Sequence, residues 1–244
     1  MATAAILGLD TAAGAYLTRL LDARGHRIRG TGSTALVDQL GVGSSVATFD
    51  DAAEAILGAG EIYDLRGDAA LVPALLATAP ATRLFVAVDP ADGTTIAALA
   101  AVRGTGAFVA TGRVHPHESR LGPGTTPLAR IVAATAAGDD PAAADLASAT
   151  DCGWTAEYVD AMARMLQQLR ALDCAIATGR VISGSDAARV AAKWFARPAP
   201  AAVAASTATP GDPAPAYAAL GWRATTWGDD LIEVLCEAIA ARRA

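Results

Sequence analysis

Residues 4–21, AAILGLDTAAGAYLTRLL, decide the fold of this chain. The apolar run from Ala4 to Leu7 is typical of a buried strand, and Gly8 ends it. The apolar residues that follow recur at helical spacing, namely Ala15, Tyr16, Leu17, Leu20 and Leu21. A strand, a glycine turn and a helix in this order predict the first unit of a Rossmann-like nucleotide-binding sheet.

The alternation of strand and helix continues to about residue 111. Strands are predicted over residues 4–7, 27–30, 45–49, 61–65, 83–88 and 106–111, with helices over residues 50–57, 69–77 and 94–102 between them. Such alternation is typical of a parallel sheet with helices on both faces. We therefore predict an α/β fold in which residues 1–111 form a doubly wound, Rossmann-like domain of the nucleotide-binding type.

The alternation loosens after residue 111. Helices are predicted over residues 127–137, 157–169, 185–194 and 227–242, with a strand over residues 175–178 and a loop over residues 197–215. Ser183 or Ser185 is the expected N-cap of the helix over residues 185–194. We expect residues 112–244 to form a smaller, helical, substrate-type lobe that packs on the sheet domain as one structural unit.

The composition excludes several classes of protein. A net charge of -6 argues against binding of nucleic acid, whose phosphates favour a basic surface. The chain has neither an uncharged apolar stretch of about 18 residues that could cross a membrane nor the basic and apolar regions of a signal peptide. The three scattered cysteines, Cys152, Cys174 and Cys236, suit buried reduced thiols. These features predict a cytoplasmic protein that binds neither nucleic acid nor membrane.

Five segments resemble one family of enzymes in the order in which they occur. They are EIYDL at 61–65, HESRLGPGTTPLARI at 117–131, TDCGWTAEYVDAMARMLQQ at 150–168, CAIATGRVIS at 174–183 and GDPAPAYAALGW at 211–222. The last of them aligns without a gap to the family segment GDPSKAREKLGW. The chain resembles the extended short-chain dehydrogenases, also called the NAD-dependent epimerase/dehydratase family, and among them most closely the GDP-mannose 4,6-dehydratases.

This resemblance implies NADP-dependent dehydration of a nucleotide sugar. In that family a Tyr-x-x-x-Lys pair and a Ser/Thr-Glu arm move protons while the nicotinamide takes and returns a hydride. The lysine lowers the pKa of the tyrosine, so that tyrosinate acts as a base near neutral pH. A tyrosine without that neighbour has a pKa of about 10 and is a poor base.

The chain departs from the family at the catalytic positions. Its only lysine is Lys193, and no tyrosine is followed four positions later by a lysine. The segment in which the family carries the tyrosine helix is reduced to residues 94–103. Arg66 and Asp68 stand where the family has small residues near the nicotinamide, and we expect a salt bridge between them to fill the cleft. The sequence therefore predicts no catalytic residue.

The ligand positions of the family differ as well. After the strand over residues 27–30, Thr31, Gly32 and Ser33 replace the arginines that bind the 2′-phosphate of NADP. Pro116 replaces an asparagine, and Thr150 replaces an arginine. Losses at cofactor and sugar-nucleotide positions together indicate a scaffold that has been kept without its active site.

The glycine turn is the candidate cofactor site, with Gly8, Thr11 and Gly14 as its candidate binding residues. The family pattern is G-x-x-G-x-x-G, whose middle glycine lets the backbone approach a pyrophosphate. Thr11 crowds that approach, and Asp10 adds a negative charge where two phosphates would lie. We expect NAD or NADP to bind weakly or not at all, and a purely structural turn is the alternative.

His117, Glu118 and Ser119 are the candidate substrate-binding residues, because the resemblance places a nucleotide-sugar contact there. The alternative is that these residues only organise their loop. His115 and His117 lack a clear third ligand, so no metal site is predicted.

The sequence allows three interpretations of the function. The first is a catalytically inactive homologue of nucleotide-sugar dehydratases that acts as a binding, regulatory or partner subunit. The second is an active NAD(P)-dependent nucleotide-sugar dehydratase or epimerase with a rebuilt site, and the third is a structural oligomer without a ligand. The missing Tyr-x-x-x-Lys pair favours the first interpretation over the second. We expect a homodimer, or a heterodimer with an intact paralogue, through the helices over residues 69–77 and 94–103, with Leu75 or Leu99 as a candidate contact.

Overall fold

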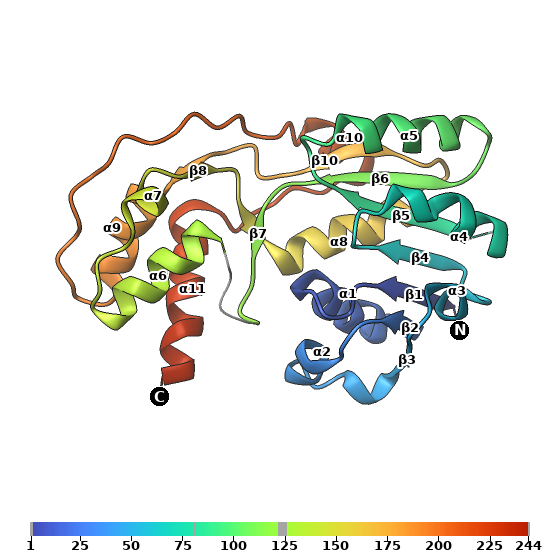
Figure 1. Cartoon of the computed structure of the whole chain (residues 1–244), viewed down its shortest axis with the longest axis horizontal. Coiled ribbons are helices and arrows are strands. Elements are labelled where there is room, and N and C mark those ends of the chain that lie inside the picture. Colours follow the sequence, from blue (N-terminus) through green and yellow to red (C-terminus); the bar gives the residue numbers. More distant parts are fainter. Residues whose placement is uncertain (1, 81, 122–125, 244) are drawn as a thin grey trace. The chain divides into compact units, whose positions relative to one another are not determined.

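A parallel sheet of seven strands is the main element of this computed structural model, which describes residues 2–80, 82–121 and 126–243 (Figure 1). The strand order is β10-β6-β5-β4-β1-β2-β3, and all neighbouring strands are parallel. The strands are β1 (Thr3–Leu7), β2 (Arg27–Thr31), β3 (Val46–Phe49), β4 (Glu61–Asp64), β5 (Arg83–Val88), β6 (Val109–Val114) and β10 (Asp173–Ile176). This topology confirms the predicted α/β class and the Rossmann-like sheet.

Strand β1 lies inside the sheet because its residues are apolar on both faces. The four residues from Ala4 to Leu7 have no exposed surface, as is typical of a parallel strand that is covered by helices on each side. Ile6 pairs with Gly30 on β2 and with Tyr63 on β4. The fold-deciding strand is therefore the one on which the two halves of the sheet meet.

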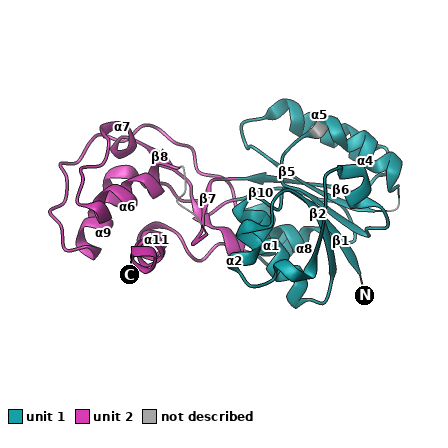
Figure 2. Ribbon diagram, turned by 60° about the horizontal axis from the view of Figure 1, so that its bottom comes forward, with its two compact units in different colours: residues 1–114, 158–176, 214–222 teal, residues 115–157, 177–213, 223–244 magenta. Residues whose placement is uncertain are grey.

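Helices cover both faces of the sheet (Figure 2). Helices α3 (Ala52–Ile56), α4 (Val72–Thr78) and α5 (Gly93–Gly104) bury apolar side chains against alternate residues of β1 and β5, which include Leu7, Leu84 and Val86. Helices α1 (Ala12–Ala23) and α8 (Thr155–Leu166) lie on the other face. The remaining elements of this part are α2 (Ala35–Gln39), α10 (Ala214–Leu220) and the 3-10 turns Gly43–Ser45 and Ala69–Leu71.

The chain divides into two compact units, and each unit consists of three separate segments of the sequence. The sheet unit contains residues 1–114, 158–176 and 214–222, and the second unit contains residues 115–157, 177–213 and 223–244 (Figure 2). The sequence suggests one boundary between residues 111 and 112. Two later segments nevertheless belong to the sheet unit, because they carry β10 and two of the helices, α8 and α10.

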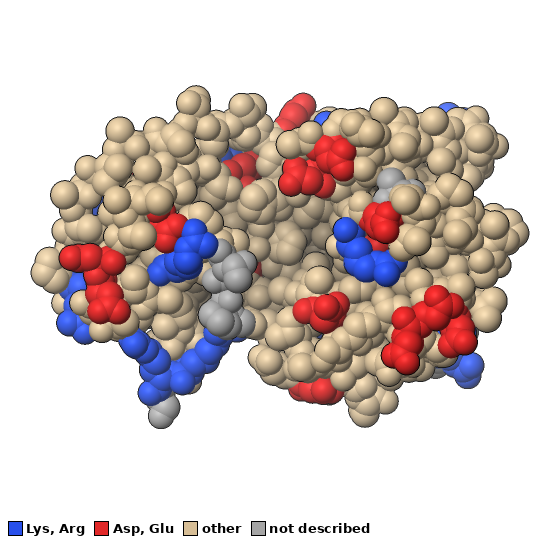
Figure 3. All heavy atoms as spheres, viewed as in Figure 1, with Lys and Arg blue, Asp and Glu red and all other residues tan. Residues whose placement is uncertain are grey.

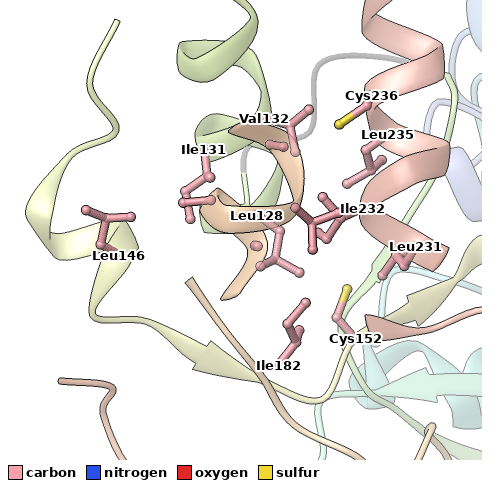
Figure 4. Close-up of a cluster of buried hydrophobic side chains, with 14 residues drawn as sticks. Leu128, Ile131, Val132, Leu146, Cys152, Ile182, Leu231, Ile232, Leu235 and Cys236 are labelled. Carbon is pink, nitrogen blue, oxygen red and sulfur yellow. The ribbon is translucent and has the colours of Figure 1, made fainter. Parts of the chain in front are cut away.

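The second unit is a helical layer with two short strand pairs. Its helices are α6 (Pro127–Ala137), α7 (Ala143–Leu146), α9 (Gly184–Trp194) and α11 (Gly228–Arg243). The parallel pair is β7 (His117–Glu118) with β9 (Gly153–Trp154), and the antiparallel pair is β8 (Ala149–Thr150) with β11 (Ile182–Ser183). Leucine, isoleucine and valine side chains of α6, α7 and α11 share a core with Cys152 and Cys236 (Figure 4).

Several local predictions are confirmed, and two strands begin and end at other residues than predicted. The Ser183 hydroxyl accepts the amide of Asp186 and caps α9, and all three cysteines are buried free thiols. The strand expected at residues 106–111 is β6 at residues 109–114, because Gly106 lies in a turn with φ of +96°. The strand expected at residues 175–178 is β10, which begins and ends two residues earlier. Within the described residues, no helix combines the length and hydropathy needed to cross a membrane.

Candidate functional site

The predicted cofactor turn lies between β1 and α1 in the sheet unit. Gly8 has a φ of +115°, a backbone conformation that favours glycine. The Thr11 hydroxyl donates to the Gly8 carbonyl oxygen at 2.8 Å and accepts the Gly14 amide at 2.9 Å, which makes Thr11 the N-cap of α1. A Cβ at Gly14 would lie 2.1 Å from the same Gly8 oxygen, so only glycine fits there. The turn brings together all three residues predicted from the sequence.

Side chains of the segment after β4 lie beside Gly8 of this turn. Around the position that a Cβ of Gly8 would occupy lie the Cβ of Leu65 at 3.5 Å and the Cγ of Arg66 at 3.7 Å. The Arg66 Nε lies 3.3 Å from Oδ1 of Asp64, which also accepts the Arg66 amide. Arg66 therefore pairs with Asp64 and not, as the sequence suggests, with Asp68, whose carboxylate accepts a backbone amide two residues later.

Asp64 is a buried acid at the carboxyl end of β4. Its side chain has no exposed surface, and its Oδ2 has no hydrogen-bond partner in the described part of the chain. Burial raises the pKa of the Asp64 carboxyl, and the contacts with Arg66 offset only part of that effect. Asp64 thereby holds Arg66 beside the glycine turn.

The end of β2 is bordered by an acid. The Thr31 carbonyl oxygen accepts the amide of Gly8 at 3.3 Å, and the Ser33 hydroxyl accepts a nearby backbone amide. The Asp10 carboxylate lies against Gly32, because a Cβ at Gly32 would be only 2.6 Å from Oδ1 of Asp10. A carboxylate thus stands beside the strand end at which an NADP-dependent fold uses a cation for the 2′-phosphate.

The tyrosines and the only lysine belong to different compact units. The tyrosines at positions 16, 63, 158 and 217 are all in the sheet unit, whereas Lys193 lies on α9 of the second unit. The Tyr63 hydroxyl donates to Glu61 at 2.8 Å. Burial raises the pKa of Tyr63 far above its usual value, and the negative charge of Glu61 raises it further. Tyr63 therefore stays protonated at neutral pH and does not supply a base.

The three candidate substrate residues lie together at β7 in the second unit. The His117 Nδ1 lies 2.9 Å from the Thr155 hydroxyl, which donates to the Glu118 carbonyl oxygen at 2.7 Å. Because Thr155 uses its proton in this way, His117 carries its own proton on Nδ1. The Glu118 carboxylate accepts the Thr126 hydroxyl, and the Ser119 hydroxyl accepts the amide two residues later. All three side chains are engaged with groups of their own unit.

Burial shifts both titratable groups of β7 towards their uncharged forms. Desolvation lowers the pKa of His117 to about 4. Desolvation also raises the pKa of Glu118, although hydrogen bonds from Thr126 and from the Ser119 amide lower it in part. A neutral imidazole and a desolvated carboxyl offer little positive charge to the diphosphate of a nucleotide sugar.

Replacing His117 by Asn is expected to remove part of the acid sensitivity of the folded protein. The folded protein protonates His117 at about pH 4, whereas the unfolded chain does so at about 6.5. Because the unfolded chain binds more protons between these values, stability is lost as the pH falls through that window, by about 3 kcal/mol in total. Urea unfolding at pH 7 and at pH 4.5 measures this loss. An unchanged pH dependence in the His117 variant would refute the assignment.

Asp151 joins three segments of the second unit and is a residue that the sequence does not single out. Its Oδ1 accepts the amide and the hydroxyl of Thr178 at 3.0 and 2.6 Å. Its Oδ2 accepts the amides of Gly179 at 2.9 Å and Gly211 at 3.0 Å. The carboxylate is buried and fully bonded, so it fixes the chain path. The one available signal is its place in the segment at 150–168 that resembles the family.

Glu157, in the same segment, has a second fully bonded carboxylate. Its two oxygens accept the amides and the hydroxyls of Thr225 and Thr226 at 2.5–3.1 Å. Nearby, the Arg180 guanidinium stacks 4.4 Å above the ring of Trp227. The polar groups that dominate this unit therefore organise loops.

The charged and potentially metal-ligating side chains are dispersed over the described part of the chain. Among the described residues, no three His, Cys, Asp or Glu side chains gather in a way that could hold a metal ion. On the face shown in Figure 3, acidic and basic side chains form separate small groups without a continuous basic surface. This distribution agrees with the acidic net charge of -6.

Sequence comparisons and structure comparisons give different results. No protein-family model matches the chain, and no curated protein matches it in sequence. Solved structures do match over the whole chain. One is a UDP-glucose-4-epimerase from Stenotrophomonas maltophila with bound NAD and formylated UDP-arabinopyranose, with a TM-score of 0.78 and 14% identity over 100% of each chain.

Two other matches carry related activities. A UDP-glucuronic acid 4-epimerase from Bacillus cereus, in complex with UDP-glucuronic acid and NAD, has a TM-score of 0.78 and 10% identity over 98% of this chain and 99% of that one. An NAD-dependent NDP-hexosamine 5,6-dehydratase involved in tunicamycin biosynthesis has a TM-score of 0.76 and 14% identity over 99% of both chains. At such low identity the likeness establishes the fold alone. The chain therefore has the Rossmann-like fold of NAD-dependent nucleotide-sugar epimerases and dehydratases.

Proposed function

We propose that the chain is a catalytically inactive homologue of the nucleotide-sugar dehydratases, related to the GDP-mannose 4,6-dehydratases, that acts as a binding, regulatory or partner subunit. The observation that carries this proposal is the lack of a Tyr-x-x-x-Lys pair in a chain whose only lysine is Lys193. The raised pKa of buried Tyr63 supports it, because that phenol is no substitute for the missing base.

The glycine turn supports the same proposal, because its residues do not fit a dinucleotide well. Thr11 uses its hydroxyl to cap α1 with the Gly14 amide, which lies in the helix turn that meets a pyrophosphate in this fold. Arg66 covers one side of Gly8, and Asp10 borders the end of β2. We propose that the turn is kept for its close packing of strand and helix.

Calorimetry with NAD and with NADP tests this proposal and separates it from an active enzyme with a rebuilt site. We expect no heat of binding that fits a micromolar dissociation constant for either cofactor. The turn lacks its middle glycine, and no arginine follows β2 to hold a 2′-phosphate. Micromolar affinity for one of them would favour the active alternative.

A rebuilt turn gives the converse test. The double variant Asp10→Thr with Thr11→Gly restores a glycine and removes the acid, so we expect it to bind NAD more tightly than the natural chain. Loss of the Thr11 cap costs about 1 kcal/mol of helix stability, which a domain of this size tolerates.

We also propose that the partner is a second copy of this chain or an intact paralogue, which docks on α4 and α5. Leu75 and Leu99 cannot be the contacts, since both are buried in the core of the sheet unit itself. The exposed face of α5 consists of small apolar residues, among them Ala97 and Ala100. Small residues let two helices approach closely, so this face suits a helix-packed dimer.

Ala97→Glu combined with Ala100→Glu is expected to dissociate such a dimer while leaving each copy folded. Both side chains are exposed in the single chain, so the glutamates meet water there and an apolar surface only in the dimer. Light scattering at high protein concentration measures the mass. Leu99→Glu serves as the contrasting variant, because it should unfold the sheet unit. A monomeric natural chain that co-purifies with no relative would refute the dimer.

A further inference from the structure

Strand β3 (Val46–Phe49) forms one edge of the seven-stranded sheet (Figure 1). Among the described strands it pairs only with β2, so about half of its backbone N–H and C=O groups point away from the sheet. Edge strands usually carry a lysine, a proline or a bulge, which blocks pairing with another chain. The sequence of β3, VATF, has no charged residue and no proline, whereas β10 at the other edge carries Asp173. β3 is therefore the edge to which a further strand can be added.

The surface beside β3 suits the side chains of an added strand. Ala47 and Thr48 are both exposed although successive side chains of a strand point to opposite faces, so neither face of β3 is fully covered. A groove of about 680 Å³ is lined by Ala47 and Phe49 of this strand and by Leu57, which is 54% exposed. An exposed leucine in a groove that also holds an aromatic ring is stabilised by contact with a further apolar side chain.

The two ends of β3 carry opposite charges. Arg27 lies beside the amino end, because Ile28 pairs with Val46, and Asp50 follows the carboxyl end. Both side chains are exposed, and neither makes a hydrogen bond or an ion pair within the described residues. In an antiparallel pair of two copies, Arg27 of each copy approaches Asp50 of the other across two strand spacings, about 10 Å, which the two side chains together can span. A parallel pair would bring like charges together, so the charges favour the antiparallel arrangement.

We propose that β3 is an interaction surface for a second copy of this chain, which adds its own β3 in antiparallel orientation about a two-fold axis. The free backbone groups of the two edge strands pair, and the Arg27–Asp50 contacts, which occur twice, fix the orientation. Because each copy contributes a strand of only four residues, the interface is small and the dissociation constant is about 0.1–1 mM. This contact is separate from the one proposed at α4 and α5 and does not rest on the proposed function.

Sedimentation velocity of the full chain with Ala97→Glu and Ala100→Glu tests the proposal, because these substitutions remove any dimer through α5. We expect the mass to rise towards that of a dimer as the protein concentration increases from about 10 µM to about 1 mM. Thr48→Lys in this background is expected to abolish the rise, since a lysine on an edge strand blocks pairing. Thr209→Lys, in the exposed loop over residues 197–213, is the matched control and should associate like the parent. A monomer at every concentration, or equal behaviour of the two lysine variants, would refute the proposal.

An exchange of charges tests the orientation of the two strands. Arg27→Glu and Asp50→Lys each replace an attraction by a repulsion at both contacts, so either substitution is expected to weaken the association about tenfold. The two substitutions together restore opposite charges and should recover the affinity of the parent, and circular dichroism verifies the fold of each variant. Amide hydrogen exchange at high protein concentration should show added protection within residues 46–49. No recovery in the combined variant, or added protection only in other segments, would overturn the proposal.

Discussion

Purified protein is expected to form a 4-keto sugar from GDP-mannose at least about 10⁴-fold more slowly than an intact 4,6-dehydratase. A positioned general base contributes about 10²–10⁴-fold to such a reaction, and its loss here is joined by a damaged cofactor turn. The chain has no lysine near any tyrosine in sequence, and Tyr63 keeps its proton. The expected rate is therefore that of the background.

The assay needs two controls because the expected result is an absence. An intact GDP-mannose 4,6-dehydratase shows that the substrate and the added NADP are competent. A mock purification from cells that lack the chain measures contaminating enzyme. Steady product formation that co-elutes with the chain and exceeds the mock sample would show that the site has been rebuilt with another base.

Asp151→Ala is expected to lower the free energy of unfolding by about 4 kcal/mol. The variant removes a buried carboxylate and leaves the donors of Thr178, Gly179 and Gly211 without their acceptor. Urea unfolding followed by circular dichroism measures the loss. Asp151→Asn is expected to lose about half as much, because its amide keeps one accepting oxygen.

Asp140→Ala is the matched control for this experiment. Asp140 is exposed and makes no hydrogen bond or ion pair within the described residues, so its removal should change stability by less than about 0.5 kcal/mol. Equal effects of the Asp140 and Asp151 substitutions would show that the four hydrogen bonds of Asp151 contribute nothing net.

The sequence predicts those strands of the sheet whose signal is local. Residues 84–88, LFVAV, are apolar without interruption, and β5 consists of these five residues and Arg83 before them. The strand after Gly106 is displaced because its register depends on a distant neighbour. β6 runs through Gly112, where the ring of Phe85 lies 2.6 Å from the position of a missing Cβ. Gly112, which the sequence suggests as the end of the strand, thus lies inside β6 and leaves room for the ring of Phe85 on β5.

In the candidate site as well, contacts between residues close in sequence can be predicted, and contacts between distant segments cannot. The glycines of the turn are recognisable because Gly8 and Gly14 meet within six residues, and the cap made by Thr11 is equally local. The coverage of Gly8 by Arg66 depends on β4 pairing with β1, which the sequence does not specify residue by residue. Asp151 accepts a hydrogen bond from the amide of Gly211, sixty residues away, and no spacing pattern in the sequence predicts such a long-range contact.

The divided sheet unit also determines when the chain can fold during synthesis. When residues up to Val114 have left the ribosome, six strands are present, but β10 and the helices α8 and α10 are still missing. The edge of β6 is then open to pairing with another chain, and the sheet face that α8 covers remains exposed. Only when Trp222 has emerged and met Tyr158 edge-on, at 5.9 Å between ring centroids, can the unit close. A fragment that ends at residue 111 is therefore expected to be insoluble, because it lacks the elements that cover the sheet and pair with β6.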